Sequence, residues 1–304
     1  MSAPLAILDI GSNSVRYAVL DRGDDGAFFV PGGRKEIWTT RLGKDLDKTG
    51  RMCADSVAAT LQACRAFSDK AKAAGVRPYA YATSAVRDAA NRQELLDALK
   101  ALCPELSVYL LSGEEEGRLA YAGAMGGQAG TLLDIGGGSA QVVTPHWSVS
   151  FPTGCVRAQG VCPEDALPRM RDVIYTWLSE RVKLPGEVQA PFFGVGGTIT
   201  SLGALLLQQT RYDGSQLTSL RLTPELLNAL LQRLWAMGDE GRARIPLLVR
   251  RHDVILQGGL ILSYFMENLP IKALTPTDRG GMEGFAMWLS EKGILDDGAS
   301  AVVK

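Results

Sequence analysis

The chain has 304 residues, 46% hydrophobic and 21% charged, a composition typical of a folded globular protein. Its formal net charge is −1 and no apolar run approaches about 18 residues, so neither nucleic acid nor a membrane is expected as a partner. The five cysteines form no CxxC pair, which favours reduced thiols in a cytoplasmic protein, and two histidines argue against a histidine-rich metal site.

The first half alternates strand and helix patterns. Two strands flank the turn Gly11–Ser14, a long helix stops at Gly75, and another helix begins at Ser112 and runs towards Ala124. The predicted strands are 5–10, 15–20, 27–30, 78–82 and 106–111, and the predicted helices are 54–74, 93–102 and 112–124.

The second half repeats this order after the glycine cluster "GAMGGQAG", which is a candidate hinge. Its predicted strands are 132–135, 142–143, 147–151 and 192–195, and its predicted helices are 164–182, 198–208, 224–237, 254–268 and 282–292. The repeated order predicts two similar α/β domains that face one another across a cleft. We expect residues 1–124 to form the first and 125–304 the second, with the last helix packing back on the first.

A Gly-rich turn after a buried aspartate occurs once in each half, in "AILDIGSNSVRYAVL" and "LLDIGGGSAQVV". Glycine allows a tight backbone whose N–H groups converge on an anion, and Asp9 or Asp134 could hold a cation beside that anion. A simpler alternative for one copy is a hairpin whose aspartate caps its own turn, but two copies favour two phosphate-binding loops. The turn residues are Gly11, Ser12, Asn13, Ser14, Gly136, Gly137, Gly138 and Ser139.

A third glycine turn, "FFGVGGTITSLGALL", places Gly194, Gly196, Gly197 and Thr198 between a strand and a helix. Helix N-termini attract anions, so this turn is another candidate phosphate contact. Glycine is also common at such junctions for packing alone.

Three consecutive glutamates begin the helix in "LLSGEEEGRLAYAG". Ser112 and Glu115 have the spacing of a capping box, and Glu114 complements the helix dipole. These structural roles leave Glu116 unexplained. A carboxylate in this position stays ionised at neutral pH, and Glu116 is therefore a candidate base that activates water.

Basic residues lie near the predicted turns. Arg87 follows a strand in "YATSAVRDAANRQELL" and suits a bidentate phosphate contact, although pairing with Asp88 is the alternative. Arg250 and Arg251, in "LLVRRHDVILQGG", are more typical of a solvated surface.

These segments together resemble the exopolyphosphatase/guanosine pentaphosphate phosphohydrolase (Ppx/GppA) family, in the superfamily of actin, Hsp70 and sugar kinases. The matching segments occur in family order: "LDIGSNSVRYAV", "ATSAVRDAAN", "LSGEEEGRLAYAG", "LDIGGGSAQVV", "FPTGCVR", "GVGGTITSLGA" and "RRHDVILQGG". The resemblance implies two ribonuclease-H-like α/β domains facing an interdomain cleft, in the short form without a helical C-terminal domain.

The resemblance also implies roles for single residues. Glu116 would activate the attacking water, with Glu115 as the alternative in the same turn. Asp134 would hold the metal or position that water, and Asp9 would help at the metal together with Glu116. Arg87 would bind the phosphate near the reacting end, and the glycine turns would cradle the others.

The implied activity is removal of terminal phosphate from inorganic polyphosphate, with pppGpp as a further substrate, Mg²⁺ or Mn²⁺ as cofactor and a homodimer as the assembly. A phosphotransferase of the same superfamily and a non-catalytic polyphosphate or nucleotide sensor are the alternatives. The chain departs from the family pattern at Gly117, at Ala140-Gln141 in place of Thr-Glu, and at Met282 in place of Arg.

Overall fold

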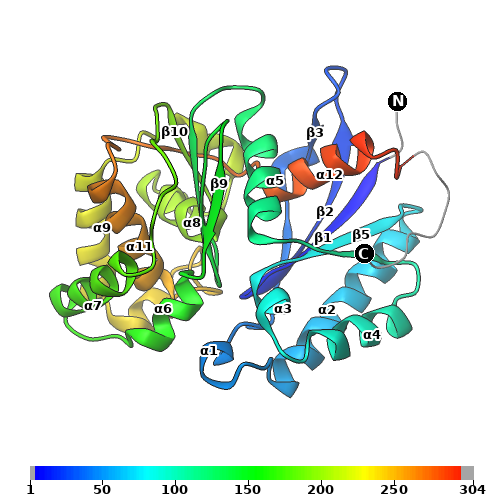
Figure 1. The fold of residues 1–304 in the computed structure, drawn as a ribbon, viewed down its shortest axis with the longest axis horizontal. Coiled ribbons are helices and arrows are strands. Elements are labelled where there is room, and N and C mark those ends of the chain that lie inside the picture. Colours follow the sequence, from blue (N-terminus) through cyan, green and yellow to red (C-terminus); the bar gives the residue numbers. More distant parts are fainter. Residues whose placement is uncertain (1–3, 296–304) are drawn as a thin grey trace. The chain divides into compact units, whose positions relative to one another are not determined.

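The computed structural model describes residues 4–295, and the chain divides into two compact units. Of the described residues, the first unit comprises 4–126 together with 279–295, and the second comprises Gly127–Asp278. Each unit is a mixed sheet with helices packed on it (Figure 1). None of the helices between residues 4 and 295 is long and apolar enough to span a membrane.

The sheet of the first unit has the strand order β3-β2-β1-β5-β6, with β4 pairing with β2. Strand β1 is antiparallel to β2 and parallel to β5, so it lies at the centre. The strands are β1 (Leu5–Ile10), β2 (Ser14–Arg22), β3 (Phe28–Phe29), β4 (Glu36–Thr39), β5 (Pro78–Ala82) and β6 (Ser107–Leu110).

Helices cover both faces of this sheet because successive β1 residues point to opposite sides. Leu8 packs in an apolar cluster with α2 and α4, whereas Ile7 packs in a second cluster with α5 and α12. The helices of this unit are α1 (Leu46–Thr49), α2 (Ala54–Ala73), α3 (Ser84–Asp88), α4 (Arg92–Leu102), α5 (Gly113–Met125) and α12 (Gly281–Glu291), with a short 3₁₀ turn at Pro31–Gly33.

Helices α5 and α12 lie side by side with their backbones in close approach (Figure 1). A methyl group on Gly284 of α12 would overlap the carbonyl oxygen of Leu119, and one on Gly123 of α5 would overlap that of Gly280. The last described helix is thereby fixed against the helix that carries Glu116.

The second unit repeats the hairpin at the centre of its sheet, whose strand order is β11-β10-β7-β8-β9. Strand β7 is antiparallel to β8 and parallel to β10, as β1 is to β2 and β5 in the first unit. The strands are β7 (Thr131–Ile135), β8 (Ala140–Val143), β9 (Ser148–Phe151), β10 (Phe192–Val195) and β11 (Thr275–Pro276).

Helix α11 is buried along most of its length in the core of the second unit. The other helices of this core pack around it and on the sheet. The helices are α6 (Cys155–Val161), α7 (Leu167–Ser179), α8 (Gly196–Leu206), α9 (Pro224–Ala236), α10 (Gly238–Ala243) and α11 (Ile255–Asn268), with a 3₁₀ turn at Gly214–Ser219.

The elements agree closely with those predicted from the sequence, and the α/β fold class with a duplicated hairpin is confirmed. Six elements were not predicted, apart from the two 3₁₀ turns: strand β4, the short helices α1, α3, α6 and α10, and the edge strand β11. The prediction separated the domains after residue 124, whereas the units in the structure change at Gly126 and again at Asp278.

We expect Gly284→Ala to destabilise the protein by about 1–3 kcal/mol, because the added methyl group would have to push α5 and α12 apart. Chemical denaturation followed by circular dichroism measures this loss. The matched control is Gly160→Ala in α6, where the methyl group would meet no atom within 4 Å and should be neutral or slightly stabilising. Equal stability of the two variants would contradict the close packing of α5 and α12.

Candidate functional site

The two Gly-rich turns have the same hydrogen-bonded structure. The Gly11 amide donates to the Ser14 carbonyl at 3.1 Å, and the Gly136 amide donates to the Ser139 carbonyl at 3.0 Å. Each turn joins the two central antiparallel strands of its sheet. The repeat seen in the sequence is therefore a repeat of local structure.

Asp9 lies in a row of side chains that crosses the first sheet. Its cross-strand neighbour on β2 is Arg16 and its neighbour on β5 is Tyr81. Arg16 Nη1 lies 3.7 Å from Asp9 Oδ2, and a side-chain hydrogen bond from Tyr81 lowers the pKa of the Asp9 carboxyl group. Paired residues share a face of the sheet, so all three side chains lie on the face that α5 and α12 cover.

Burial dominates the electrostatics of this row. It raises the pKa of the Asp9 carboxyl group, while Arg16, the Tyr81 hydrogen bond and Lys35 act in the opposite direction. Burial also holds the pKa of Tyr81 well above its ordinary range, with Asp9 as the next contributor. Asp9 therefore lies where a further cation would be favourable, because it would offset the cost of burying the ionised carboxylate.

Glu116 is held by Arg87. Arg87 Nη1 lies 3.3 Å from Glu116 Oε2 and donates to the Leu111 carbonyl at 3.0 Å, while its Nε lies 3.3 Å from Asp88. The pairing with Asp88 suggested by the sequence is present, and it is combined with the contact to Glu116. The Glu116 side chain is 17% exposed, so it is oriented by a fixed neighbour and still reaches solvent.

The other two glutamates of this turn have the structural positions expected for them. The Ser112 amide donates to Glu115 Oε2 at 2.8 Å and the Glu115 amide donates to Ser112 Oγ at 3.2 Å, which confirms the capping box. Glu114 is exposed. Because the cap occupies the Glu115 carboxylate, Glu116 is the better candidate for a chemical role.

In the second unit, Asp134 occupies the position equivalent to Asp9, and its cross-strand neighbour is Gln141. Gln141 Nε2 donates to Ser139 Oγ at 2.9 Å and to Ser150 Oγ at 3.2 Å. The neutral amide, which replaces the glutamate usual in the family pattern, thus ties the second turn to its sheet.

The third glycine turn lies at the N-terminus of α8, close to Asp134. A methyl group on Gly196 would lie 2.6 Å from Asp134 Oδ1, and one on Gly197 would overlap the guanidinium group of Arg251. The structure therefore brings Asp134 and Arg251 to the start of this helix. Arg251 was read from the sequence as a surface residue, because nothing in its local pattern shows which helix it packs against.

The remaining predicted residues belong to the same turns. Ser12, Ser14, Ser139 and Thr198 are buried, and Asn13 is half-buried. The Ser12 carbonyl accepts from the Gly43 amide at 2.8 Å, so the segment after β4 supports the first turn. Of these hydroxyl groups, that of Ser139 accepts a hydrogen bond from Gln141.

Within residues 4–295, no group of three or more His, Cys, Asp or Glu side chains is arranged to hold a metal ion. Asp9 on β1 and Glu116 in the first turn of α5 are the two carboxylates of the first unit that were predicted to hold a metal. Magnesium is commonly bound by one or two carboxylates together with water and substrate phosphate. The oxygen donors present fit such a shared site better than a closed protein cage.

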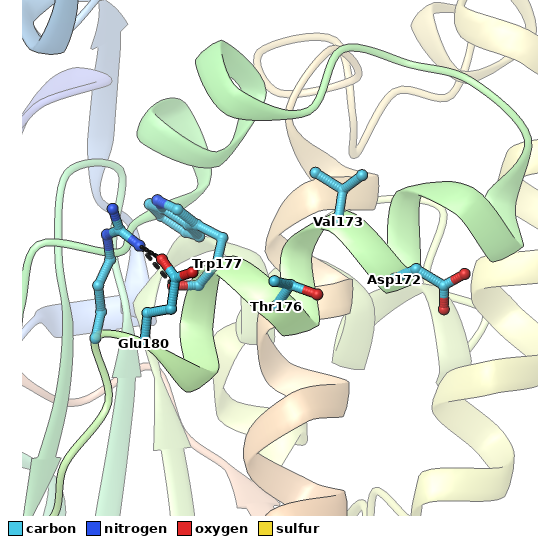
Figure 2. Close-up of a pocket in the computed structure, with 6 residues that line it drawn as sticks. Asp172, Val173, Thr176, Trp177 and Glu180 are labelled. Carbon is cyan, nitrogen blue, oxygen red and sulfur yellow. Dashed lines mark hydrogen bonds and ion pairs between the residues drawn. The ribbon is translucent and has the colours of Figure 1, made fainter.

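A separate surface hollow of about 410 Å³ lies along α7 (Figure 2). Arg181 stacks on the Trp177 ring and donates a hydrogen bond to Glu180 at 2.9 Å. Asp172 adds a second carboxylate to the lining. None of the turn residues lines this hollow. Its acidic lining is unsuited to a phosphate chain.

Comparison with known proteins identifies the family of this chain. The sequence matches the Ppx/GppA phosphatase family over residues 25–291. This chain belongs to that family. The predicted family is thus confirmed, and so is the predicted enzyme class, a hydrolase of phosphoanhydride bonds.

Named relatives of the Ppx/GppA family align along nearly the whole chain. Exopolyphosphatase 2 of Mycobacterium tuberculosis is 30% identical over 318 residues, covering 94% of this chain and 98% of the relative. Exopolyphosphatase 1 of Mycobacterium leprae is 30% identical over 292 residues, covering 89% and 84%.

Solved structures of the family share this fold. The Aquifex aeolicus Ppx/GppA family member is 28% identical, with a TM-score of 0.74 over 95% of this chain and 98% of that chain. An exopolyphosphatase from Cytophaga hutchinsonii has a TM-score of 0.82 over 99% and 100%, but at 21% identity it supports the fold alone.

We expect Gly197→Ala to lower the rate of phosphate release about tenfold or more while leaving stability nearly unchanged. The added methyl group would displace the flexible guanidinium group of Arg251 rather than backbone, so the fold should be preserved. If this guanidinium group contacts phosphate, its displacement removes a charge-assisted hydrogen bond, which contributes about 1.5–3 kcal/mol. Steady-state kinetics and thermal unfolding measure the two effects.

The matched comparison is Arg250→Ala beside Arg251→Ala. Arg250 is exposed, so its loss should have little effect on activity, whereas loss of Arg251 should reproduce the effect of Gly197→Ala. Full activity of Arg251→Ala would contradict a role for this guanidinium group.

Proposed function

We propose that this protein is an exopolyphosphatase that hydrolyses the terminal phosphoanhydride bond of inorganic polyphosphate and releases orthophosphate, with pppGpp as a second substrate. The relatives described above that are named exopolyphosphatase support the substrate class. The observation that carries the proposal is the pair Glu116–Arg87, a partly exposed carboxylate oriented by a guanidinium group.

In the proposed reaction a water molecule attacks the terminal phosphorus atom. The bond to the bridging oxygen breaks, orthophosphate leaves, and the chain becomes one phosphate shorter. Glu116 accepts the proton of the attacking water, and Arg87 keeps this carboxylate in place. An arginine has five N–H donors, so Arg87 can contact a phosphate oxygen as well as the carboxylate.

Positive groups beside the first turn suit a polyanion. Arg16 and Lys35 both lower the pKa of the Asp9 carboxyl group, and Arg87 is paired with Glu116. Fixed positive charge of this kind stabilises the negative charge that spreads over the phosphoryl oxygens during transfer.

Magnesium, or manganese in its place, is the proposed cofactor, and it would neutralise charge on the phosphate oxygens when bound. Asp9 and Glu116 would hold it in the first unit. Asp134 is the candidate in the second unit for a metal ligand or for a group that orients water. The proposal also includes a homodimer in the cytoplasm, and the five free thiols agree with a reducing compartment.

We expect Glu116→Gln to lower kcat for phosphate release about 10²-fold or more, because the amide cannot accept the proton of the attacking water. The KM for polyphosphate should change little, since the side chain keeps its shape. Release of orthophosphate from polyphosphate of one defined length is the measurement.

Glu114→Gln is the matched control, because it removes the same charge from an exposed position in the same helical turn. It should retain activity close to that of the unmodified protein. An unchanged rate in Glu116→Gln would contradict the assigned base, and so would an equal loss in both variants.

The proposed substrate leads to a second test, phosphate release from polyphosphates of several defined lengths and from pppGpp, with Mg²⁺, with Mn²⁺ and with chelator. We expect release with either metal and little without one. Transfer to an added acceptor without free phosphate would indicate a phosphotransferase instead. Binding without any turnover would indicate a sensor.

A further inference from the structure

The row across the first sheet continues beyond Asp9 to two tyrosines. Tyr81 on β5 pairs with Asp9 on one side and with Tyr109 of β6 on the other. Both tyrosines are buried and both pack against the Phe285 ring of α12, at centroid distances of 5.0 and 5.6 Å. The two tyrosines thus lie on the same face of the sheet, pack against the same aromatic ring and are similarly buried.

The two hydroxyl groups differ in what they contact. Tyr81 lies beside Asp9 on the neighbouring strand, and a side-chain hydrogen bond from it lowers the pKa of the Asp9 carboxyl group. The Tyr109 hydroxyl, in contrast, has no hydrogen-bond partner in the part of the chain that the structure describes. Leaving a buried hydroxyl unpaired is unfavourable, and pairing one with a carboxylate is among the stronger hydrogen bonds. Of the two tyrosines, only Tyr81 is therefore in a position to act on the Asp9 carboxyl group.

Helix α12 is shaped around the Tyr81 hydroxyl. A methyl group on Gly281 would lie 2.8 Å from this oxygen, closer than such contacts allow, so glycine leaves the space that the hydroxyl fills. The next residue, Met282, is buried in the apolar cluster that also contains Tyr81.

We propose that Tyr81 is a positioning residue whose hydroxyl fixes the Asp9 carboxylate in the orientation that binds Mg²⁺. This rests on the proposed function, in which Asp9 helps to hold the metal. Carboxylates that bind a metal are generally held by neighbouring hydrogen bonds, and loss of such a neighbour costs about 10–100-fold in metal affinity or activity.

The test compares Tyr81→Phe with Tyr109→Phe in the full chain. Mn²⁺ binding, measured by electron paramagnetic resonance without substrate, should weaken about tenfold or more in Tyr81→Phe and stay within about twofold in Tyr109→Phe. The Mg²⁺ concentration that half-saturates phosphate release from polyphosphate should rise in the same variant. A purely structural role would leave both metal readouts unchanged once the protein is folded.

Gly281→Ala provides an independent variant, because its methyl group presses on the hydroxyl without removing the ring. It should weaken Mn²⁺ binding when Tyr81 is present. In the double variant with Tyr81→Phe, the methyl group finds space and the further loss should be much smaller, a coupling that a double-mutant cycle detects.

Three results would overturn the inference: Mn²⁺ affinity unchanged in Tyr81→Phe, an equal loss in both tyrosine variants, or no Mn²⁺ binding by the unmodified protein. Failure of the proposed function is distinguishable from all three. In that case the unmodified protein binds Mn²⁺ but releases no phosphate, and the binding measurements alone still decide the role of Tyr81.

Discussion

The Asp9 carboxylate is only 14% exposed and lies at the edge of an apolar cluster, where a charge is costly unless charged or hydrogen-bonding groups surround it. Arg16 and Tyr81 meet this requirement from the two neighbouring strands. Their positions depend on the register of β1 with β2 and β5. A slip of one residue would turn Asp9 to the opposite face, among the residues that pack on α2 and α4. The surroundings of the Asp9 carboxylate therefore depend on the register in which the central strands pair.

The two units keep the same turn but place different groups beside it. The aspartate pairs across the strands with Arg16 in the first unit and with Gln141 in the second. The first arrangement keeps a charged pair, while the second links a neutral amide to Ser139 and Ser150. A charged pair therefore lies beside the first turn and a neutral amide beside the second.

Much of this arrangement could be predicted from local sequence. Alternating apolar residues and the glycine turns locate the central strands, and the capping box accounts for Glu115 and leaves Glu116 to be explained. The roles of Tyr81 and Arg251 could not be predicted in this way. Each depends on a partner far along the chain, Asp9 for the first and Gly197 for the second, and the partner is set by strand pairing or helix packing. Strand β4 was missed because its four residues lack a clear apolar alternation.

The close approach of α12 to α5 has a consequence for how the protein can be divided. The chain passes from the first unit to the second and then returns, so the first unit is assembled from two separated stretches of sequence. A fragment cut after residue 126 would lack α12 and would expose the apolar side of β1 and β5 that this helix covers. Expressing the first unit alone would therefore require a permuted gene that joins its two stretches, whereas the second unit is continuous in sequence.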